Sequence, residues 1–203
     1  IMLPTFCKLA VCPHCGGKNE IFQLMSGNTC GAMLWSDMRQ LAPMLPRVSP
    51  IQKCSFCGHY FYLSEAKFEN GNTYSSELGW LPFEDAVEAY SELYDTEISK
   101  LELLTMIVVW AFNDKIRHSE IEAEPEHLDL LRKIIVKSLG QPIFIGNPMF
   151  RSEMYREIGE FDKCLAILNE YTPENDFQAK IKEMMITKAH NKESRVFLVE
   201  GEG

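Results

Sequence analysis

The sequence predicts an α+β protein, in which a small β-structured N-terminal part is followed by an all-α antiparallel helical domain. Residues 1–66 are rich in Cys, Gly and Pro and contain two short β-prone segments, 21–25 and 60–63. From Phe83 onward, apolar residues recur at helical intervals. A chain of 203 residues with 46% hydrophobic residues is long and apolar enough to bury a core.

Each predicted helix has its own start or stop signal. Pro82 suits the first turn of a helix over residues 83–94. Residues 98–117 are apolar nearly all round in their middle, which predicts a buried central helix. Gly140 and Pro142 end the helix that follows it. The remaining predicted helices cover 125–139, 148–159, 160–171 and 173–189, and Asn147 is the expected cap of the second of these. Residues 191–203 are predicted to be a tail that is frayed or contains a short extended segment.

The boundary between the two parts is predicted within residues 68–79, which are polar, contain glycine and show no hydrophobic periodicity. The N-terminal domain then covers residues 1–67 and the helical domain residues 80–190. Charge divides the same way: residues 1–66 carry five Lys/Arg and three Asp/Glu, whereas the rest has a net charge of −11. Such an acidic surface repels phosphate, which disfavours nucleic-acid binding.

Two C-x-x-C pairs mark the N-terminal part, in CPHCGG (12–17) and CSFCGH (54–59). Zinc prefers four soft or borderline ligands in a tetrahedron, and a C-x-x-C turn places two thiolates along one edge of it. Gly16 and Gly58 follow the pairs and tolerate the positive φ that such turns need. The sequence therefore predicts a zinc ribbon in which one structural Zn²⁺ ion per chain is held by Cys12, Cys15, Cys54 and Cys57.

A redox pair and a rubredoxin-like iron site are the alternatives. A thioredoxin-like site needs only one C-x-x-C, set between strand and helix, whereas iron would use the same four ligands. His14 and His59 lie beside the ligands and are predicted to be surface residues. The other cysteines are predicted to be buried small hydrophobes: Cys7, Cys30 and Cys164.

Between the two pairs lies a long excursion, residues 26–50. Long loops are often functional, so a dedicated binding site is one reading. The reading we favour is that Trp35, Met44 and Leu45 dock the ribbon onto the helices. Asp37 and Arg39 are then expected to be solvated charges at the rim.

The segment GEFDKCLAIL, 159–168, resembles the turn and second-helix start of a tetratricopeptide repeat, with Tyr155 at the expected place in the first helix and Cys164 where alanine is usual. This resemblance implies a repeat-like hairpin over 148–171. With the C-x-x-C ribbon and the G-N-T, W-S-D and P-M-L-P motifs of its loop, the chain resembles a group of uncharacterised bacterial zinc-ribbon proteins. That second resemblance implies a fold and supplies no catalytic residues.

The sequence contains no phosphate-cradling Gly loop, no H-E-x-x-H and no G-x-S-x-G. The carboxylates at 120, 122, 124 and 126 are interpreted as a solvated charge run, and the flanking His118 and His127 as an opportunistic cation site at most. No catalytic residue is assigned. We therefore favour a non-enzymatic scaffold or adaptor that docks a protein partner.

Two other functions stay open. A ribbon that binds nucleic acid would contact phosphates through its basic residues, Lys8, Lys18, Arg39, Arg47 and Lys53. An enzyme would have its site between the ribbon loop and the helices, near Trp35 and Asp37.

A cytoplasmic protein without a membrane partner is expected. The apolar opening lacks a basic n-region and is interrupted by Lys8, so it is not predicted to be a signal peptide. The longest apolar run, 103–112, is about half of a membrane span. Four of the seven cysteines sit in C-x-x-C pairs, which in a reducing compartment favours metal over disulfides.

Overall fold

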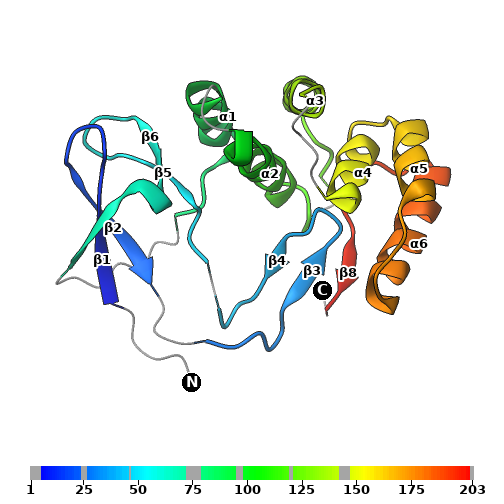
Figure 1. Ribbon diagram of the computed structural model, residues 1–203, viewed down its shortest axis with the longest axis horizontal. Coiled ribbons are helices and arrows are strands. Elements are labelled where there is room, and N and C mark those ends of the chain that lie inside the picture. The colour runs from blue at the N-terminus through cyan, green and yellow to red at the C-terminus, as the bar shows by residue number, and fades with distance from the viewer. Residues whose placement is uncertain are drawn as a thin grey trace. The chain divides into compact units, whose positions relative to one another are not determined.

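The computed structural model describes residues 6–23, 27–45, 47–71, 79–94, 98–118, 121–141 and 147–201. Within these residues the chain is a mixed α+β protein, with small antiparallel sheets near the N-terminus followed by helices (Figure 1). It divides into two compact units. The first unit comprises Ile1–Ala32 and Leu41–Thr96, and the second comprises Met33–Gln40 and Glu97–Gly203.

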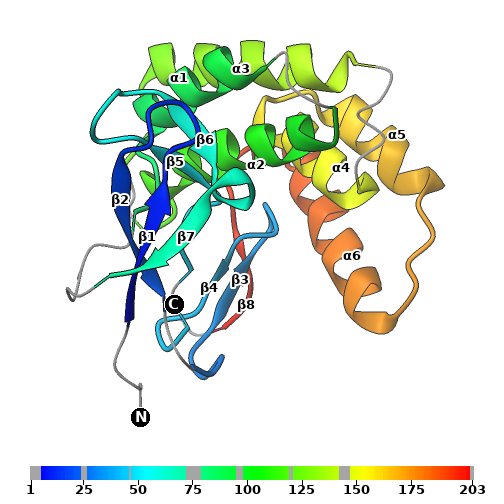
Figure 2. The same ribbon diagram turned by 60° about the vertical axis from the view of Figure 1, so that its left-hand side comes forward.

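The main sheet of the first unit is three-stranded and antiparallel, in the order β2-β1-β7 (Figure 2). Its strands are β1 (Phe6–Val11), β2 (Lys18–Gln23) and β7 (Lys67–Asn70). The predicted strand over 21–25 overlaps the end of β2, and its last two residues lie outside the described part of the chain. The alternating side chains of β1 and β2 bury Ala10 and Ile21 in the core of this unit.

A second hairpin of the first unit joins β5 (Ile51–Lys53) to β6 (Tyr60–Tyr62), with Lys53 opposite Tyr60. The predicted strand over 60–63 is thus confirmed except for its last residue, which begins a short 3-10 helix, η1 (Leu63–Glu65). All three residues of β6 are buried, and Phe61 packs with Ala10 and Ile21.

Helix α1 (Phe83–Leu93) also belongs to the first unit. Its buried residues recur at helical spacing and form one apolar face: Phe83, Ala86, Ala89, Tyr90 and Leu93. The predicted boundary segment 68–79 includes residues 72–78, which lie outside the described residues.

The second unit contains the other five of the six α-helices found among the described residues. They are α2 (Ile98–Asp114), α3 (Pro125–Leu139), α4 (Pro148–Glu157), α5 (Phe161–Glu170) and α6 (Asp176–His190). Asn147 caps α4 by accepting from the Met149 N–H at 2.9 Å, and Asn175 caps α6 by accepting from the Gln178 N–H at 2.9 Å. No described helix is long and apolar enough to cross a membrane.

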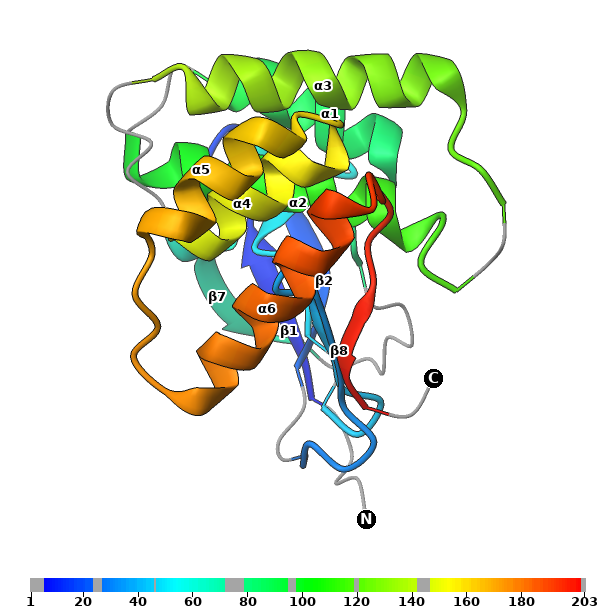
Figure 3. The same cartoon turned by 90° about the vertical axis from the view of Figure 1, so that its right-hand side faces the viewer.

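A short sheet accompanies these helices, in the order β4-β3-β8. Its strands are β3 (Met33–Trp35), β4 (Gln40–Leu41) and β8 (Leu198–Glu200). The tail thus contains the short extended segment predicted as one alternative, which is the strand β8 (Figure 3) and pairs with β3. Val199 of this strand packs into the cluster that contains Ile181 and Met185 of α6.

Candidate metal centre

The two C-x-x-C pairs lie in hairpin loops with the same backbone hydrogen bonds. In each loop the N–H of the first cysteine donates to the carbonyl five residues on, at 2.8 Å for Gly17 and 2.9 Å for His59. Its own carbonyl accepts from a glycine four residues on, Gly16 or Gly58, at 2.9 Å in both loops. These glycines have φ values of +75° and +78°, which other residues rarely adopt. The turn geometry expected from the sequence is thus present twice.

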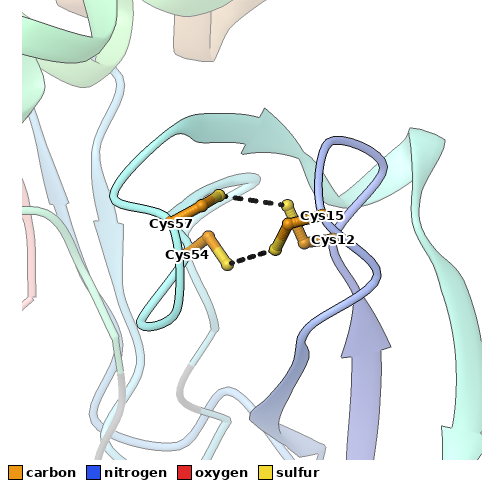
Figure 4. Close-up of side chains that lie close together, drawn as sticks. All are labelled: Cys12, Cys15, Cys54 and Cys57. Carbon is orange, nitrogen blue, oxygen red and sulfur yellow. Dashed lines mark hydrogen bonds between the residues drawn. The ribbon is translucent and has the colours of Figure 1, made fainter.

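The four sulfurs of these loops converge on one small volume (Figure 4). The Sγ atoms of Cys12 and Cys57 are 3.9 Å apart, those of Cys15 and Cys54 are 3.7 Å apart, and all four lie within 4.8 Å of one another. A disulfide would hold its sulfurs at about 2.05 Å, and all four cysteines are free. Sulfurs at about 2.3 Å from a tetrahedral ion would lie about 3.8 Å apart. The cluster therefore has the right dimensions and could hold a metal ion.

The first cysteine of each pair is buried and the second is exposed. Cys12 and Cys54 are each 1% exposed and belong to the core cluster of the first unit, whereas Cys15 and Cys57 face solvent. Two of the four sulfur ligands thus lie in the hydrophobic core, and the other two are accessible to solvent.

Asn19 of β2 bonds to both loops, and it is almost fully buried. Its Nδ2 donates to the Gly17 carbonyl at 3.1 Å and to the Cys54 sulfur at 3.6 Å. Its Oδ1 accepts from the Ser55 N–H at 2.9 Å and from the Ser55 hydroxyl at 3.0 Å. Sequence reasoning missed this residue, because no motif marks a single asparagine within a strand.

The thiols of the cluster differ in pKa. Burial opposes ionisation of Cys54, but the N–H groups of Cys57 and Phe56 and the Asn19 side chain lower its pKa to about 6. For Cys57, the N–H of His59 lowers the pKa, but partial desolvation and the neighbouring sulfurs outweigh it and raise the pKa to about 12. Hydrogen bonds shared among the neighbouring sulfurs add to this difference, because they lower the pKa of Cys54 and raise that of Cys57, whereas a divalent cation would favour the thiolate form of all four cysteines.

Two further contacts join the loops at the surface. The exposed rings of His14 and His59 stack with their centroids 5.1 Å apart. The Phe56 ring lies over Gly17, where a Cβ would come within 2.5 Å of its Cδ2. His59 also contacts Glu92 of α1, with Nδ1 2.9 Å from Oε1. Both histidines are surface residues, as predicted, and among the described residues the metal-ligating group contains the four cysteines alone.

Helix α1 is tied to the second hairpin by a carboxylate stripe, defined here as Asp85, Glu88 and Glu92. The Lys53 ammonium lies 2.6 Å from Asp85 and 3.3 Å from Glu88. The buried Tyr60 hydroxyl donates to the same two carboxylates, at 2.8 Å each. The bonds from Lys53 hold the pKa of Asp85 below its usual range. The strands that flank Cys54 and Cys57 are thereby anchored to the helix.

Two residues expected at the rim of the long loop are buried instead. Asp37 is 0% exposed and Arg39 is 4% exposed, so the prediction of solvated charges is wrong. The Asp37 carboxylate accepts from Asn113 and from Arg117, both at 2.9 Å, and its carbonyl accepts from Trp110 at 2.8 Å. The chain reverses after Asp37 at Met38, whose φ is +63°. Partners on α2 and in the turn after it make this burial possible.

These contacts extend into a buried ionic network of the second unit. Asn113 donates to Glu157 at 3.0 Å, the Arg156 Nε donates to Glu153 at 2.8 Å, and the Ser36 hydroxyl donates to Glu153. Burial, with Glu153 and Asp37 nearby, raises the pKa of Glu157 well above its usual range. The charged residues of this network are buried and bond to one another.

The other candidate residues named from the sequence do not join the cysteine cluster. Cys7 and Cys164 are buried as predicted, but Cys30 is exposed, so the prediction for it is wrong. Glu122, Glu124 and Glu126 are exposed and Glu120 lies outside the described residues. His118 is exposed, and His127 Nδ1 lies 3.3 Å from Glu124.

Comparison with family models, with curated proteins and with solved structures finds no match to this chain. The resemblances to bacterial zinc-ribbon proteins and to the tetratricopeptide repeat therefore stay predictions. What is established is the four-cysteine cluster and its geometry.

Proposed function

We propose that the four-cysteine cluster binds one structural Zn²⁺ ion and that the chain is a non-enzymatic scaffold or adaptor for a protein partner. The observation that carries the proposal is the convergence of four free sulfurs, with contacts of 3.7 and 3.9 Å between the two loops. These spacings suit tetrahedral thiolate coordination of zinc.

A structural role follows from the ligand count. With all four positions taken by cysteines, a tetrahedral ion has no position left for water or substrate. The strands that carry the loops are only three to six residues long, so their packing alone is a modest source of stability. Metal binding would then contribute directly to the folding free energy of the first unit.

The helical unit supports a scaffold role. α4 and α5 are joined by a turn in which Gly159 has a φ of +81°, and Tyr155 and Phe161 pack against one hydrophobic cluster. This hairpin covers the predicted repeat-like segment. The acidic residues of the second unit that could have served chemistry, Asp37 and Glu157, are sealed inside the ionic network.

The nucleic-acid alternative gains no support from the basic residues named for it. Lys18 pairs with Glu69 at 2.6 Å, and Lys53 pairs with the carboxylate stripe. Arg39 is buried inside the second unit. Three of the five candidate phosphate contacts are therefore engaged within the protein.

Elemental analysis of the purified chain tests the metal proposal. Wild type should carry near one zinc per chain, and Cys15→Ser should lose it because only three thiolates remain. Cys30→Ser is the matched control, since Cys30 is also an exposed free cysteine but lies outside the cluster. Iron in place of zinc would correct the metal's identity, and unchanged zinc in Cys15→Ser would refute the ligand set.

Affinity capture with wild type and Cys15→Ser as parallel baits tests the scaffold proposal. A partner that depends on the folded first unit should be recovered by wild type and Cys30→Ser and lost with Cys15→Ser. A bait that enriches nothing above an unrelated protein of similar charge would count against a scaffold.

A further inference from the structure

We infer that Asn19 is a positioning residue of the metal centre: its carboxamide fixes the two cysteine loops relative to each other and directs an N–H···S bond at the Cys54 sulfur. The inference rests on the proposed zinc site. It concerns a residue that touches no ion itself and acts through the ligands.

The geometry uses both ends of the carboxamide. The donor end meets the Gly17 carbonyl of the first loop at 3.1 Å and the Cys54 sulfur of the second loop at 3.6 Å. The acceptor end meets the backbone N–H and the hydroxyl of Ser55, at 2.9 and 3.0 Å. Because Ser55 presents an N–H, the oxygen of Asn19 must face it, and the amide orientation is fixed.

Because Asn19 is buried, loss of its hydrogen bonds would cost free energy. Asn19 is 8% exposed, so water cannot readily replace its partners. A side chain that bonds both loops removes relative motion that the ion would otherwise have to restrain. Partners of this kind, one shell outside the ligands, change metal affinity by about 10- to 100-fold when mutated.

The bond from Asn19 to the Cys54 sulfur also makes the two cysteine loops different from each other. Their backbone hydrogen bonds match, yet among the described contacts only the second loop receives a side-chain N–H donor at its buried cysteine, Cys54. An N–H donor takes up part of the negative charge of a thiolate and so lowers the energy of its sulfur electrons. Asn19 should therefore influence the spectrum of a bound transition metal as well as its affinity.

Asn19→Asp tests the inference, because it keeps the acceptor for Ser55 and replaces the donor by a carboxylate oxygen facing Gly17 and Cys54. The matched control is Gln52→Glu. Gln52 is a buried carboxamide of the same unit, which donates to the Ser49 and Gly79 carbonyls at 2.8 and 3.1 Å and, within the described part of the chain, bonds to no sulfur.

Two measurements on the full chain separate positioning from stability. Competition for Zn²⁺ against a chelator should show affinity reduced about 10- to 100-fold in Asn19→Asp. With Co²⁺ as probe, the sulfur-to-cobalt charge-transfer band should move to lower energy in Asn19→Asp and stay in place in Gln52→Glu. A purely structural loss would lower affinity without moving the band.

The outcomes are distinguishable. If wild type binds neither Zn²⁺ nor Co²⁺ stoichiometrically, the proposed metal site itself fails. If wild type binds both, and Asn19→Asp matches Gln52→Glu in band position and affinity, the positioning role of Asn19 is overturned and the site stands.

If Asn19→Asp does not fold, Ser55→Ala tests the positioning role instead. It removes the hydrogen bond from the Ser55 hydroxyl that helps to orient the Asn19 carboxamide, and it changes no buried side chain. Faster loss of Zn²⁺ to chelator than from wild type would support the inference, and an equal rate would overturn it.

Discussion

Within each C-x-x-C pair, the place of a cysteine in the hairpin loop determines whether it is buried or exposed. The first cysteine follows a strand directly and is drawn into the core, whereas the second lies beyond the turn and is exposed. A competing ligand would therefore reach Cys15 and Cys57 before it reaches Cys12 and Cys54. Metal exchange should start at the exposed sulfurs, while the buried ones keep the loops in register.

Glu157 is a residue whose charge works against the fold at neutral pH. Burial and the neighbouring Glu153 and Asp37 raise its pKa well above its usual range. The folded state then binds this proton more tightly than the unfolded state, so the stabilising contribution is complete below the unfolded pKa, about 4.3, and is lost as pH rises through the folded pKa. Replacing Glu157 by Gln removes the ionisable carboxyl group and keeps a side chain of nearly the same size and shape.

We therefore expect Glu157→Gln to gain stability relative to wild type as pH rises from about 5 to about 8. Thermal unfolding measured across that range checks it. Glu170→Gln, at an exposed end of α5, is the control and should parallel wild type. A constant difference between Glu157→Gln and wild type at every pH would show that Glu157 does not titrate in this range.

Local pattern explains which site residues the sequence could identify. The four cysteines were predictable because each pair carries its ligand spacing and its glycine within six residues. Asn19 was not, because its role depends on Ser55, 36 residues away. Asp37 was misjudged for the same reason: a charged residue is usually solvated, and its burial depends on Arg117, 80 residues away.

At the level of elements, the helices were more predictable than the strands. Caps and prolines mark helix ends locally, as at Asn147, although α6 starts at Asp176, after Asn175, and not at Pro173. Strands of two or three residues, such as β3, β4 and β8, are too short to show alternation. Their pairing is set by distant segments, which a linear pattern does not reveal.

The carboxylate stripe of α1 makes a second prediction possible. The Tyr60 ring is 2% exposed and its hydroxyl bonds Asp85 and Glu88 at 2.8 Å each. Tyr60→Phe removes these bonds to charged acceptors but lets water reach the partly exposed carboxylates. The expected loss is about 1–2 kcal/mol of unfolding free energy, measured by denaturant unfolding.

Ser91→Ala is the control on the same helix, because the exposed Ser91 hydroxyl bonds only the Val87 carbonyl of its own turn among the described residues. Its change should stay within about 0.5 kcal/mol. Equal stability of the Tyr60 and Ser91 variants would mean that the stripe does not anchor the second hairpin.

At the level of the whole molecule, the two units have separate hydrophobic clusters. One cluster gathers Ala10, Ile21 and Phe61 with the buried cysteines, and the other gathers residues of α4, α5 and α6 with Val199. The metal would belong to the first alone. Structural zinc contributes about 10–16 kcal/mol in small zinc domains, which is as large as the whole stability of a typical domain, about 5–15 kcal/mol.

Removing the metal should therefore unfold the first unit and leave the second folded. Hydrogen exchange of the zinc-loaded chain, followed segment by segment with and without a strong chelator, measures this. Protection should fall in β1, β2, β5 and β6 and persist in α4 and α5, and added Zn²⁺ should restore it. The far-UV helical signal should drop only slightly, because α1, with 11 residues, is the one described α-helix of the first unit. If hydrogen-exchange protection is lost to the same extent in both units, the two units fold as one. If protection does not change in either unit, the ion has no structural role.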